Sequence, residues 1–451
     1  MKKNVNDIIN SLGGTGKLAN LLGVNPSAVS NYRQKGFPDR LHLKIAMLCE
    51  ERSVQISNDV LGGVTVPKII KTNPKEYLSG TSLSMVKHLS TGGFDLIDPP
   101  VIVSADKVLD RMGENSADRL FIFSDQEGLR LCLRPDLTIP TCLYYLDQGF
   151  TGEKKLYSYF GKVFQLRLDN SSGPSEYSQA GLEYIGKQDQ LASEIEIFYK
   201  VESSLRSEGL KNYHTFMGDV SLFSIFLDVM DLPDLWRKKL KAKYWNESDF
   251  KALLEDLSFK KSVDNELARR VFSLDRESAT DLVRRSLGMS FEATPIGRSV
   301  EEIMERLRQK GEEFSLQPLS KVTVNLIKEF LSISDKPFKA LDRLRLISKN
   351  LDSSLLRQID TAKERLEQIK ELGVNLDKSE FSSEKGREVE YYTGFLFDFV
   401  NSQKGKSIHL GGGGRYDNLI RSMGSKTDIP AVGAALNMEN LEKALSLRLL
   451  Q

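Results

Sequence analysis

The sequence has few of the residues from which disulfide frameworks and metal sites are built. Its 451 residues include three cysteines and four histidines. The cysteines Cys49, Cys132 and Cys142 are scattered and have apolar neighbours, which favours free, buried thiols over a disulfide framework or a zinc site. The histidines lie too far apart for a spaced ligand motif, so neither a metal nor another cofactor is predicted.

Long apolar runs and a strong net charge are also missing. No stretch approaches the roughly 18 apolar residues of a membrane helix, and no apolar segment of secretory length follows the two lysines at the N-terminus. We therefore expect a cytoplasmic protein. The net charge is +1, so the chain as a whole is no general polyanion binder and any contact with nucleic acid must be local. The length predicts two to three domains.

Residues 1–52 are predicted to form a small all-α helix-turn-helix module. The pattern in residues 7–50 indicates three or four short helices, with Gly23 ending one helix and Pro26 in the first turn of the next. In that second helix Ala28 and Val29 face inward, and the side chains predicted to project are those of Ser27, Ser30, Asn31, Tyr32, Arg33, Gln34 and Lys35. This layout resembles the Cro-like helix-turn-helix family.

The resemblance leaves two roles open for this module. Residues 1–51 carry seven Lys/Arg and four Asp/Glu, a local charge of about +3 that suits phosphate contacts. In a DNA-binding role Ser27, Asn31 and Arg33 would face base edges or phosphates, as in this motif. The alternative is a dimerisation or docking element that no longer binds DNA. Residues 53–75 lack a sustained period and are predicted to be a linker.

The remainder of the chain predicts an α+β fold with an antiparallel sheet flanked by helices. Apolar residues alternate on both sides of a turn-prone segment at 125–128, as in an antiparallel hairpin. Aromatic-rich segments such as KLYSYFGKVFQLRL, EYSQAGLEYIG and YYTGFLFDFV supply further strands. Residues 236–376 show heptad-like apolar spacing with many charges and are predicted to form a helical insertion, whose charges form a solvated face or dock a partner chain.

Six segments resemble, in order, the marker segments of histidyl-tRNA synthetase, a class II aminoacyl-tRNA synthetase. They are LRPDLTIP, YFGKVFQLR, QAGLEYIG, REVEYYTG, GGGGRYD and PAVGAALNMENL. The resemblance implies a class II core made of residues 76–235 and 377–451. It also implies a homodimer formed across the first marker, which would include Pro99 and Pro100.

The same resemblance implies that the chemistry of tRNA charging is lost. Class II enzymes direct arginines at the ATP phosphates to offset developing negative charge. Gln165 stands where the second marker has one of these arginines, Arg167 replaces an acid, and Asn440 stands at the second arginine. Asn437 replaces a glycine that faces the nucleotide. The chain also ends soon after the third marker, so we expect no anticodon-binding domain.

The amino-acid pocket is better preserved in this comparison. The resemblance implies contacts with the ammonium, the carboxylate and the imidazole of histidine, which such a zwitterion requires. Asp136 is shorter, and Glu390 longer, than the corresponding acids of the family. The implied pocket residues are Asp136, Thr138, Gln179, Glu183, Arg387, Glu390, Tyr391, Tyr392, Arg415 and Tyr416, followed in the motif by Asp417. The alternative is a vestigial pocket, with core tyrosines and a glycine-rich turn at Gly411 to Gly414.

A retained pocket without ATP arginines resembles the regulatory subunit of ATP phosphoribosyltransferase. In that family the subunit has no activity of its own. It assembles as a hetero-oligomer with the short-form catalytic subunit, permits its activity and takes part in L-histidine feedback in histidine biosynthesis. Two alternatives remain: a histidine-sensing, DNA-binding transcription regulator, which specific and salt-dependent DNA binding would reveal, and an active histidyl-tRNA synthetase, which ATP-dependent pyrophosphate exchange would reveal.

Overall fold

The chain divides into two compact units, Met1–Asn73 and Pro74–Gln451. The computed structural model describes residues 4–52, 54, 80–112, 118–166, 175–259, 265–288, 299–385, 391–403 and 406–449. The predicted linker at 53–75 lies outside these residues except for Val54, and so do Arg387, Glu390 and Arg167. Each unit is described by itself.

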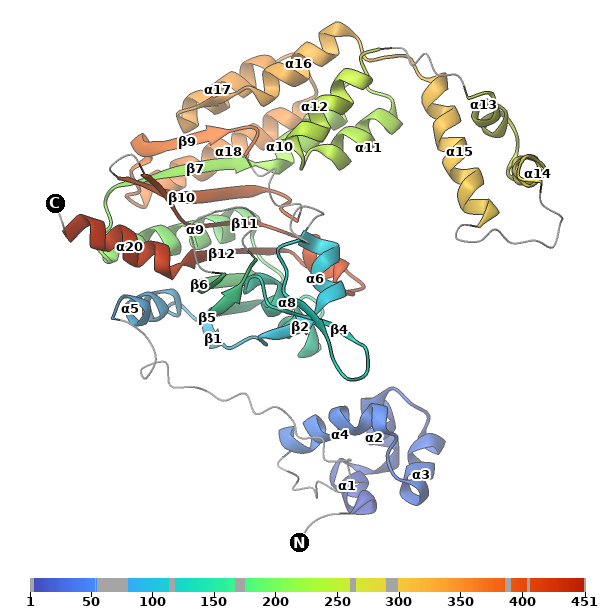
Figure 1. Cartoon of the computed structure of the whole chain (residues 1–451). Helices are drawn as coiled ribbons and strands as arrows, with labels where there is room; N and C mark the ends of the chain where they lie inside the picture. Colours follow the sequence, from blue (N-terminus) through green and yellow to red (C-terminus); the bar gives the residue numbers. More distant parts are fainter. Residues whose placement is uncertain are drawn as a thin grey trace. The chain divides into compact units, whose positions relative to one another are not determined.

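The first unit is a bundle of short helices around its own core (Figure 1). Its helices are α1 (Val5–Ser11), α2 (Gly14–Leu22), α3 (Pro26–Lys35) and α4 (Asp39–Glu51). Gly23 ends α2 in the left-handed conformation with φ +70°, and Pro26 begins α3, where its missing N–H leaves no helical bond unmade. The predicted helix, turn and helix are therefore present between residues 14 and 35.

One predicted projection from α3 is wrong. Tyr32 is buried and packs edge-on against Phe37, with ring centroids 6.1 Å apart. Val29 is also buried, and residue 32 follows it by three positions, so both side chains lie on the same helix face. The hydroxyl of Tyr32 favours exposure, but its ring supplies apolar area that this small core needs.

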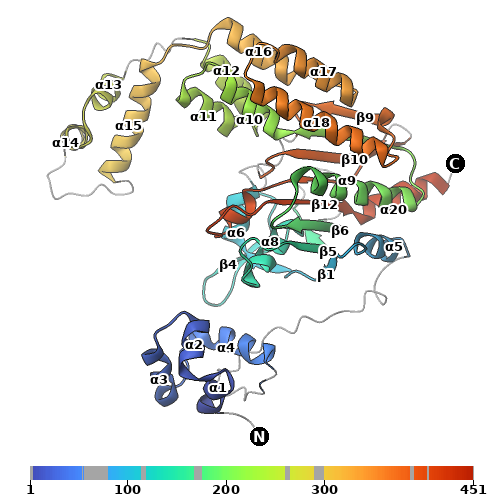
Figure 2. The same ribbon diagram turned by 180° about the vertical axis from the view of Figure 1, so that it is seen from behind.

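A mixed sheet organises the second unit (Figures 1 and 2). The run from β5 to β7 is antiparallel, as predicted, whereas β1 joins β5 and β9 joins β7 in parallel. In the described part of the chain the nine strands are, in spatial order, β1 (Asp95–Ile97), β5 (Lys155–Phe164), β6 (Glu176–Ile185), β12 (Ala431–Asn437), β11 (Lys406–Arg415), β10 (Phe395–Gln403), β7 (Tyr213–Asp219), β9 (Ser379–Ser382) and β8 (Ser334–Asp335).

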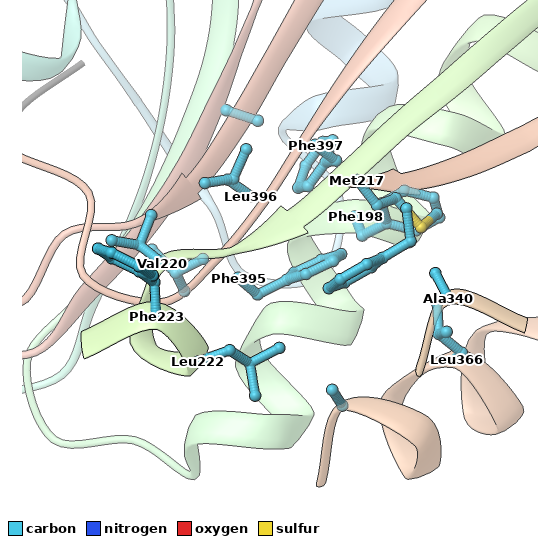
Figure 3. Close-up of a cluster of buried hydrophobic side chains, with 14 of the residues drawn as sticks. Phe198, Met217, Val220, Leu222, Phe223, Ala340, Leu366, Phe395, Leu396 and Phe397 are labelled. Carbon is cyan, nitrogen blue, oxygen red and sulfur yellow. The ribbon is translucent and has the colours of Figure 1, made fainter. Parts of the chain in front are cut away.

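The two faces of this sheet have different partners. On β6 the side chains of Leu182 and Tyr184 join the main hydrophobic core, to which α9 (Gln190–Ser207) contributes. Residues alternate between faces along a strand, so Glu183 points to the other face. That face packs on α8 (Thr138–Asp147), α6 (Ala105–Met112) and α19 (Leu419–Ser422). Figure 3 shows the main core, where Phe198 of α9 meets Phe395 and Phe397 of β10.

The main core also includes most of the predicted helical insertion. Side chains from residues 236–257 and 319–376 join the same buried cluster as the sheet. The helices that surround this core, apart from α9, are α5 (Gly80–Leu89), α10 (Val220–Val229), α11 (Asp234–Lys243), α12 (Glu247–Asp256), α16 (Lys321–Leu331), α17 (Pro337–Ile347), α18 (Ser353–Glu371) and α20 (Met438–Leu449), with a 3₁₀ turn at Leu376–Lys378.

Three further helices have a small core of their own. They are α13 (Glu266–Ser273), α14 (Arg276–Ser286) and α15 (Val300–Ser315). Helices α13 and α15 approach most closely at Gly311, where an added Cβ would lie 2.3 Å from the carbonyl oxygen of Ala268. Only this part of the predicted insertion is therefore separate from the sheet core among the described residues.

A second, small antiparallel sheet lies beside α6. It consists of β2 (Ile102–Ser104), β4 (Arg130–Leu133) and β3 (Ile122–Ser124). Strands β3 and β4 pair as Ile122 with Cys132 and Ser124 with Arg130, so the predicted hairpin is confirmed. The three cysteines are free and buried, also as predicted. Among the described helices, none has both the length and the apolar composition that crossing a bilayer demands.

Candidate functional site

Glu183 lies at the bottom of a group of tyrosines on the face of the sheet opposite α9. Its side chain is fully buried. Tyr159 on β5 donates a hydrogen bond to Oε1 at 2.9 Å, and the hydroxyl of Tyr416, just after β11, donates to Oε2. Both tyrosines are also buried. We call Glu183, Tyr159 and Tyr416 the floor.

Five half-buried side chains lie near the floor or beside the segment that contacts it, and we call them the rim. Gln179 on β6 accepts a hydrogen bond from the Leu137 amide at 3.1 Å, and Asp136 accepts one from the Ile139 amide at 2.9 Å. Tyr391 lies edge-on to Tyr392 and to Tyr416, with centroids 5.1 Å and 5.9 Å apart. The rim residues are Asp136, Thr138, Gln179, Tyr391 and Tyr392.

Burial gives the two acids of this site unusual proton affinities. Burial raises the pKa of Glu183 from 4.5 to about 7, although hydrogen bonds from Tyr416, Thr138 and Tyr159 oppose the shift. Burial likewise raises the pKa of Asp136 from 3.8 to about 6, opposed by the amides of Ile139 and Thr138. Two carboxyl groups that titrate near neutrality inside a ring of hydroxyls favour a ligand that brings a cation or an N–H donor.

The structure therefore brings together seven of the sequence-predicted pocket residues, but Arg415 lies elsewhere. The guanidinium of Arg415 points to the opposite face, where its Nη2 donates to Ser193 Oγ at 2.9 Å and to the Gln190 carbonyl at 3.0 Å. Its Nε pairs with buried Glu194. Alternation explains this placement, because Arg415 and Tyr416 are consecutive residues and face opposite ways.

The side chains at the two positions where the class II resemblance implies phosphate arginines make contacts within the chain. The Gln165 amide donates to the Pro135 carbonyl at 2.9 Å, and the Asn440 amide donates to the His409 carbonyl at 2.8 Å. Between these positions Glu439 accepts hydrogen bonds from the Ser178 amide at 2.7 Å and from Lys162 at 3.1 Å. The side chains at 165, 439 and 440 are uncharged or acidic, so they offer a nucleotide triphosphate little of what an arginine offers.

In the N-terminal unit, the proposed DNA-facing residues separate into two groups. Ser27 and Asn31 are exposed on α3. Arg33 is half-buried, and its guanidinium donates to Asn10 at 2.9 Å and to Asn6 at 3.3 Å, which ties α3 to α1. An arginine with these internal contacts has fewer donors left for a phosphate or a base.

Three residues that build or support the site were not predicted from the sequence. Tyr159 sits in the segment YSYFGKVF, where an alternating strand pattern cannot tell a core tyrosine from one that donates to an acid. Arg134, in LRPDLTIP, is buried and donates to the Lys162 carbonyl at 2.7 Å and to the Pro99 carbonyl. Glu194 lies in a helix whose charged residues gave no signal of burial. The pairing partners of all three come from distant segments.

Comparisons with known proteins agree with this geometry. The family model described as histidyl-tRNA synthetase matches residues 76–317 and 250–441. A histidyl-tRNA synthetase structure from Nostoc sp. PCC 7120 superposes with a TM-score of 0.52 at 12% identity, covering 82% of this chain and 72% of that chain. The family match and the fold thus define a histidyl-tRNA-synthetase-like class II protein.

Relatives with higher sequence identity assign the chain to a family within this class. A protein of Rhizobium johnstonii named ATP phosphoribosyltransferase regulatory subunit is 31% identical over 350 residues, which cover 77% of this chain and 92% of the relative. One of the same name from Agrobacterium fabrum is 30% identical with the same coverage. A structure from Bacillus halodurans, titled ATP phosphoribosyltransferase regulatory subunit/histidyl-tRNA synthetase, has a TM-score of 0.54 at 18% identity, covering 81% and 78%. The chain belongs to the ATP phosphoribosyltransferase regulatory subunit family.

Replacing Glu183 by Gln is expected to change how stability depends on pH. The unfolded chain releases the Glu183 proton near pH 4.5 and the folded chain near pH 7, so the folded chain binds the extra proton between these values. The wild-type protein therefore loses stability as the pH rises through this window. About 3 kcal/mol of that loss should be absent from Glu183→Gln, as measured by urea unfolding at several pH values.

Glu176→Gln is the matched control, because Glu176 lies on the same strand with its side chain 54% exposed. Its unfolding free energy should follow that of the wild type at every pH. Parallel curves for Glu183→Gln and the wild type would contradict the assignment of a raised pKa to Glu183.

Proposed function

We propose that this chain is the non-catalytic regulatory subunit of an ATP phosphoribosyltransferase and acts in the cytoplasm in the first step of L-histidine biosynthesis. Its partner is the short-form catalytic subunit, whose activity it permits, and L-histidine is the effector. The observation that carries the proposal is the contrast between the two parts of the site. The acid and tyrosine groups are kept, whereas the positions of the phosphate arginines are occupied by Gln165 and Asn440 in internal hydrogen bonds.

The proposed histidine site is the floor and rim, with Arg387 and Glu390 as further contacts expected from the sequence. Asp136, Thr138 and Gln179 are suited to the ammonium group, because they present carboxyl, hydroxyl and amide oxygens at the half-buried rim. Glu183 with its tyrosines is suited to an N–H group deeper in the site. Arg415 is left out of direct contact, since its guanidinium is held by α9.

A homodimer is the second part of the proposal. Six exposed large apolar side chains lie on the small sheet, on its hairpin and on the segment that precedes it, and exposed apolar side chains of this kind can form an interaction surface. They are Leu96, Val101, Ile102, Ile122, Phe123 and Leu129, with exposed fractions of 40% to 59%. This surface adjoins Pro99 and Pro100, where the class II resemblance implies the contact between two copies.

DNA binding by the N-terminal unit is a second candidate function. The helix, turn and helix at residues 14–35 and the exposed polar side chains of Ser27, Ser30, Asn31, Gln34 and Lys35 support it. Arg33 contributes to this proposal by fixing α3 on α1. The competing role is a docking element, which requires no contact with DNA.

The regulatory-subunit proposal is tested by mixing this protein with the catalytic chain and measuring phosphoribosyltransferase activity. The short catalytic chain, supplied with phosphoribosyl pyrophosphate and ATP, should gain activity when this protein is added, and histidine should change that activity. Arg387→Ala and Asp136→Asn should each weaken the histidine effect about tenfold, because each removes one charged contact. Asp147→Asn, at the exposed end of α8, is the control. No gain of activity on mixing would contradict the proposal.

Substitution on the apolar patch tests the homodimer. Ile102→Glu, at a side chain 51% exposed, should shift the protein toward monomers in sedimentation velocity, because a buried unpaired carboxylate is costly. Val322→Glu, at a side chain 77% exposed on α16, should leave the sedimentation coefficient unchanged. Equal sedimentation of the wild type and Ile102→Glu would rule out this patch as the dimer contact.

Titration with labelled DNA tests the N-terminal unit. If it reads DNA, a selected duplex should bind with an affinity that falls steeply with salt, and Asn31→Ala should relax base preference by roughly 1–3 kcal/mol at one position. Asn20→Ala, at an exposed residue of α2, serves as the comparison. Binding that is weak and identical for every sequence would favour the docking role.

A further inference from the structure

Four buried charged side chains from four different elements meet on the α9 side of the sheet. They are Glu194 of α9, Asp219 at the end of β7, Arg365 of α18 and Arg415 at the end of β11, and each side chain is at most 2% exposed. Glu194 is shared: Oε1 lies 2.5 Å from Arg415 Nε, and Oε2 lies 2.6 Å from Arg365 Nε. Arg365 Nη1 also donates to Asp219 at 3.1 Å.

The far end of this network is the segment that carries Tyr416. The carbonyl of Arg415 accepts a hydrogen bond from the Thr393 amide at 2.8 Å, and the Asp417 amide donates to Thr393 Oγ1 at 3.0 Å. Asp417 also accepts a hydrogen bond from Arg415 Nη1 at 3.0 Å. Tyr416 lies between these two anchored residues, and Tyr392 directly precedes Thr393.

We propose that Arg365 and Glu194 are positioning residues for the floor and rim. Arg365 holds Glu194, and Glu194 holds the Arg415 guanidinium. Through the main chain of Arg415 this arrangement fixes Tyr416 against Glu183 and Thr393 beside it. Both act from the opposite face of the sheet, so neither touches a ligand bound at the floor. This inference rests on the proposed histidine site.

The chemistry of the network makes Arg365 the sensitive member. Without Arg365, the buried carboxylates of Glu194 and Asp219 have one arginine fewer beside them. A buried carboxylate that has lost its paired cation is costly in a medium of low dielectric. Arg365 also lies over the Phe395 ring, 4.6 Å from its centroid. A lysine at this position supplies one point charge in place of the planar fork that bridges two carboxylates, so it should restore only part of the effect.

Arg365 connects the predicted helical insertion to the site on the sheet. Helix α18 belongs to the stretch predicted as a helical insertion, and Figure 3 shows Leu366 of the same helix in the main core, together with Phe395. The insertion thus contributes a charge that shapes a site built by the sheet. A shift of α18 relative to the sheet is therefore expected to displace Glu194 and, through Arg415, the side chain of Tyr416.

The test measures histidine affinity by calorimetry and amide exchange by mass spectrometry on the full chain. Arg365→Met and Glu194→Gln should each weaken histidine binding about tenfold, and Arg365→Lys should give an intermediate value. Peptides covering 391–394 and 415–417 should exchange faster in Arg365→Met, while peptides covering 155–164 keep the wild-type rate. Arg357→Met is the matched control, because Arg357 is exposed on the same helix and its guanidinium donates to Ser353, outside the buried network.

A double-mutant cycle separates positioning from general stability. If Arg365 acts through Tyr416, Arg365→Met should cost little further affinity in a Tyr416→Phe background, whereas the losses of melting temperature should add. Affinity and exchange equal to those of Arg357→Met would overturn the inference. If the wild type binds no histidine, the proposed site fails, and exchange at 391–394 and 415–417 alone decides whether Arg365 positions this segment.

Discussion

The absence of a side chain at Gly433 is the constraint on which the site depends. Gly433 pairs with Glu183 across β12 and β6, and a Cβ on it would lie 1.4 Å from Glu183 Oε2. Any other residue at 433 would displace the carboxyl group from between Tyr159 and Tyr416. Gly181 is under a similar constraint, because its Cβ would lie 2.6 Å from the Tyr159 hydroxyl. The glycines of these strands thus leave room for a buried acid where a sheet normally packs apolar side chains.

The two faces of the sheet carry different buried ionisable groups, and these groups are connected at the end of β11. The floor is an acid with hydroxyl donors, so its protonation responds to pH near neutrality. The network on the α9 side is built from full ion pairs. There burial alone would lower the pKa of Arg415, but Glu194 and Asp417 raise it above its usual range. Because Arg415 and Tyr416 are adjacent, the ion pairs on one face are connected through the main chain to the hydroxyl that donates to Glu183 on the other.

The side chains at 165 and 440 and the side chains of the floor depend on different contacts in this chain. Gln165 and Asn440 carry uncharged amides at the two positions where the class II resemblance implies arginines, and both amides donate hydrogen bonds within the chain. The floor, by contrast, consists of residues that are buried in the sheet, such as Tyr159 and Glu183. The side chains at 165 and 440 can therefore differ from arginine without disturbing the floor.

The sequence by itself determined the antiparallel strands, the hairpin, the helix, turn and helix at residues 14–35 and the resemblance on which the family assignment was first based. Each of these follows from local spacing or from an ordered set of short motifs. Only the tertiary structure decided that Tyr32 is buried, that Arg33 ties α3 to α1 and that Arg415 turns away from the floor. It also decided that much of the predicted insertion shares the sheet core. The reason is the same throughout: the partner of each side chain lies far away in sequence, so its role is set by packing between segments, which local pattern does not record.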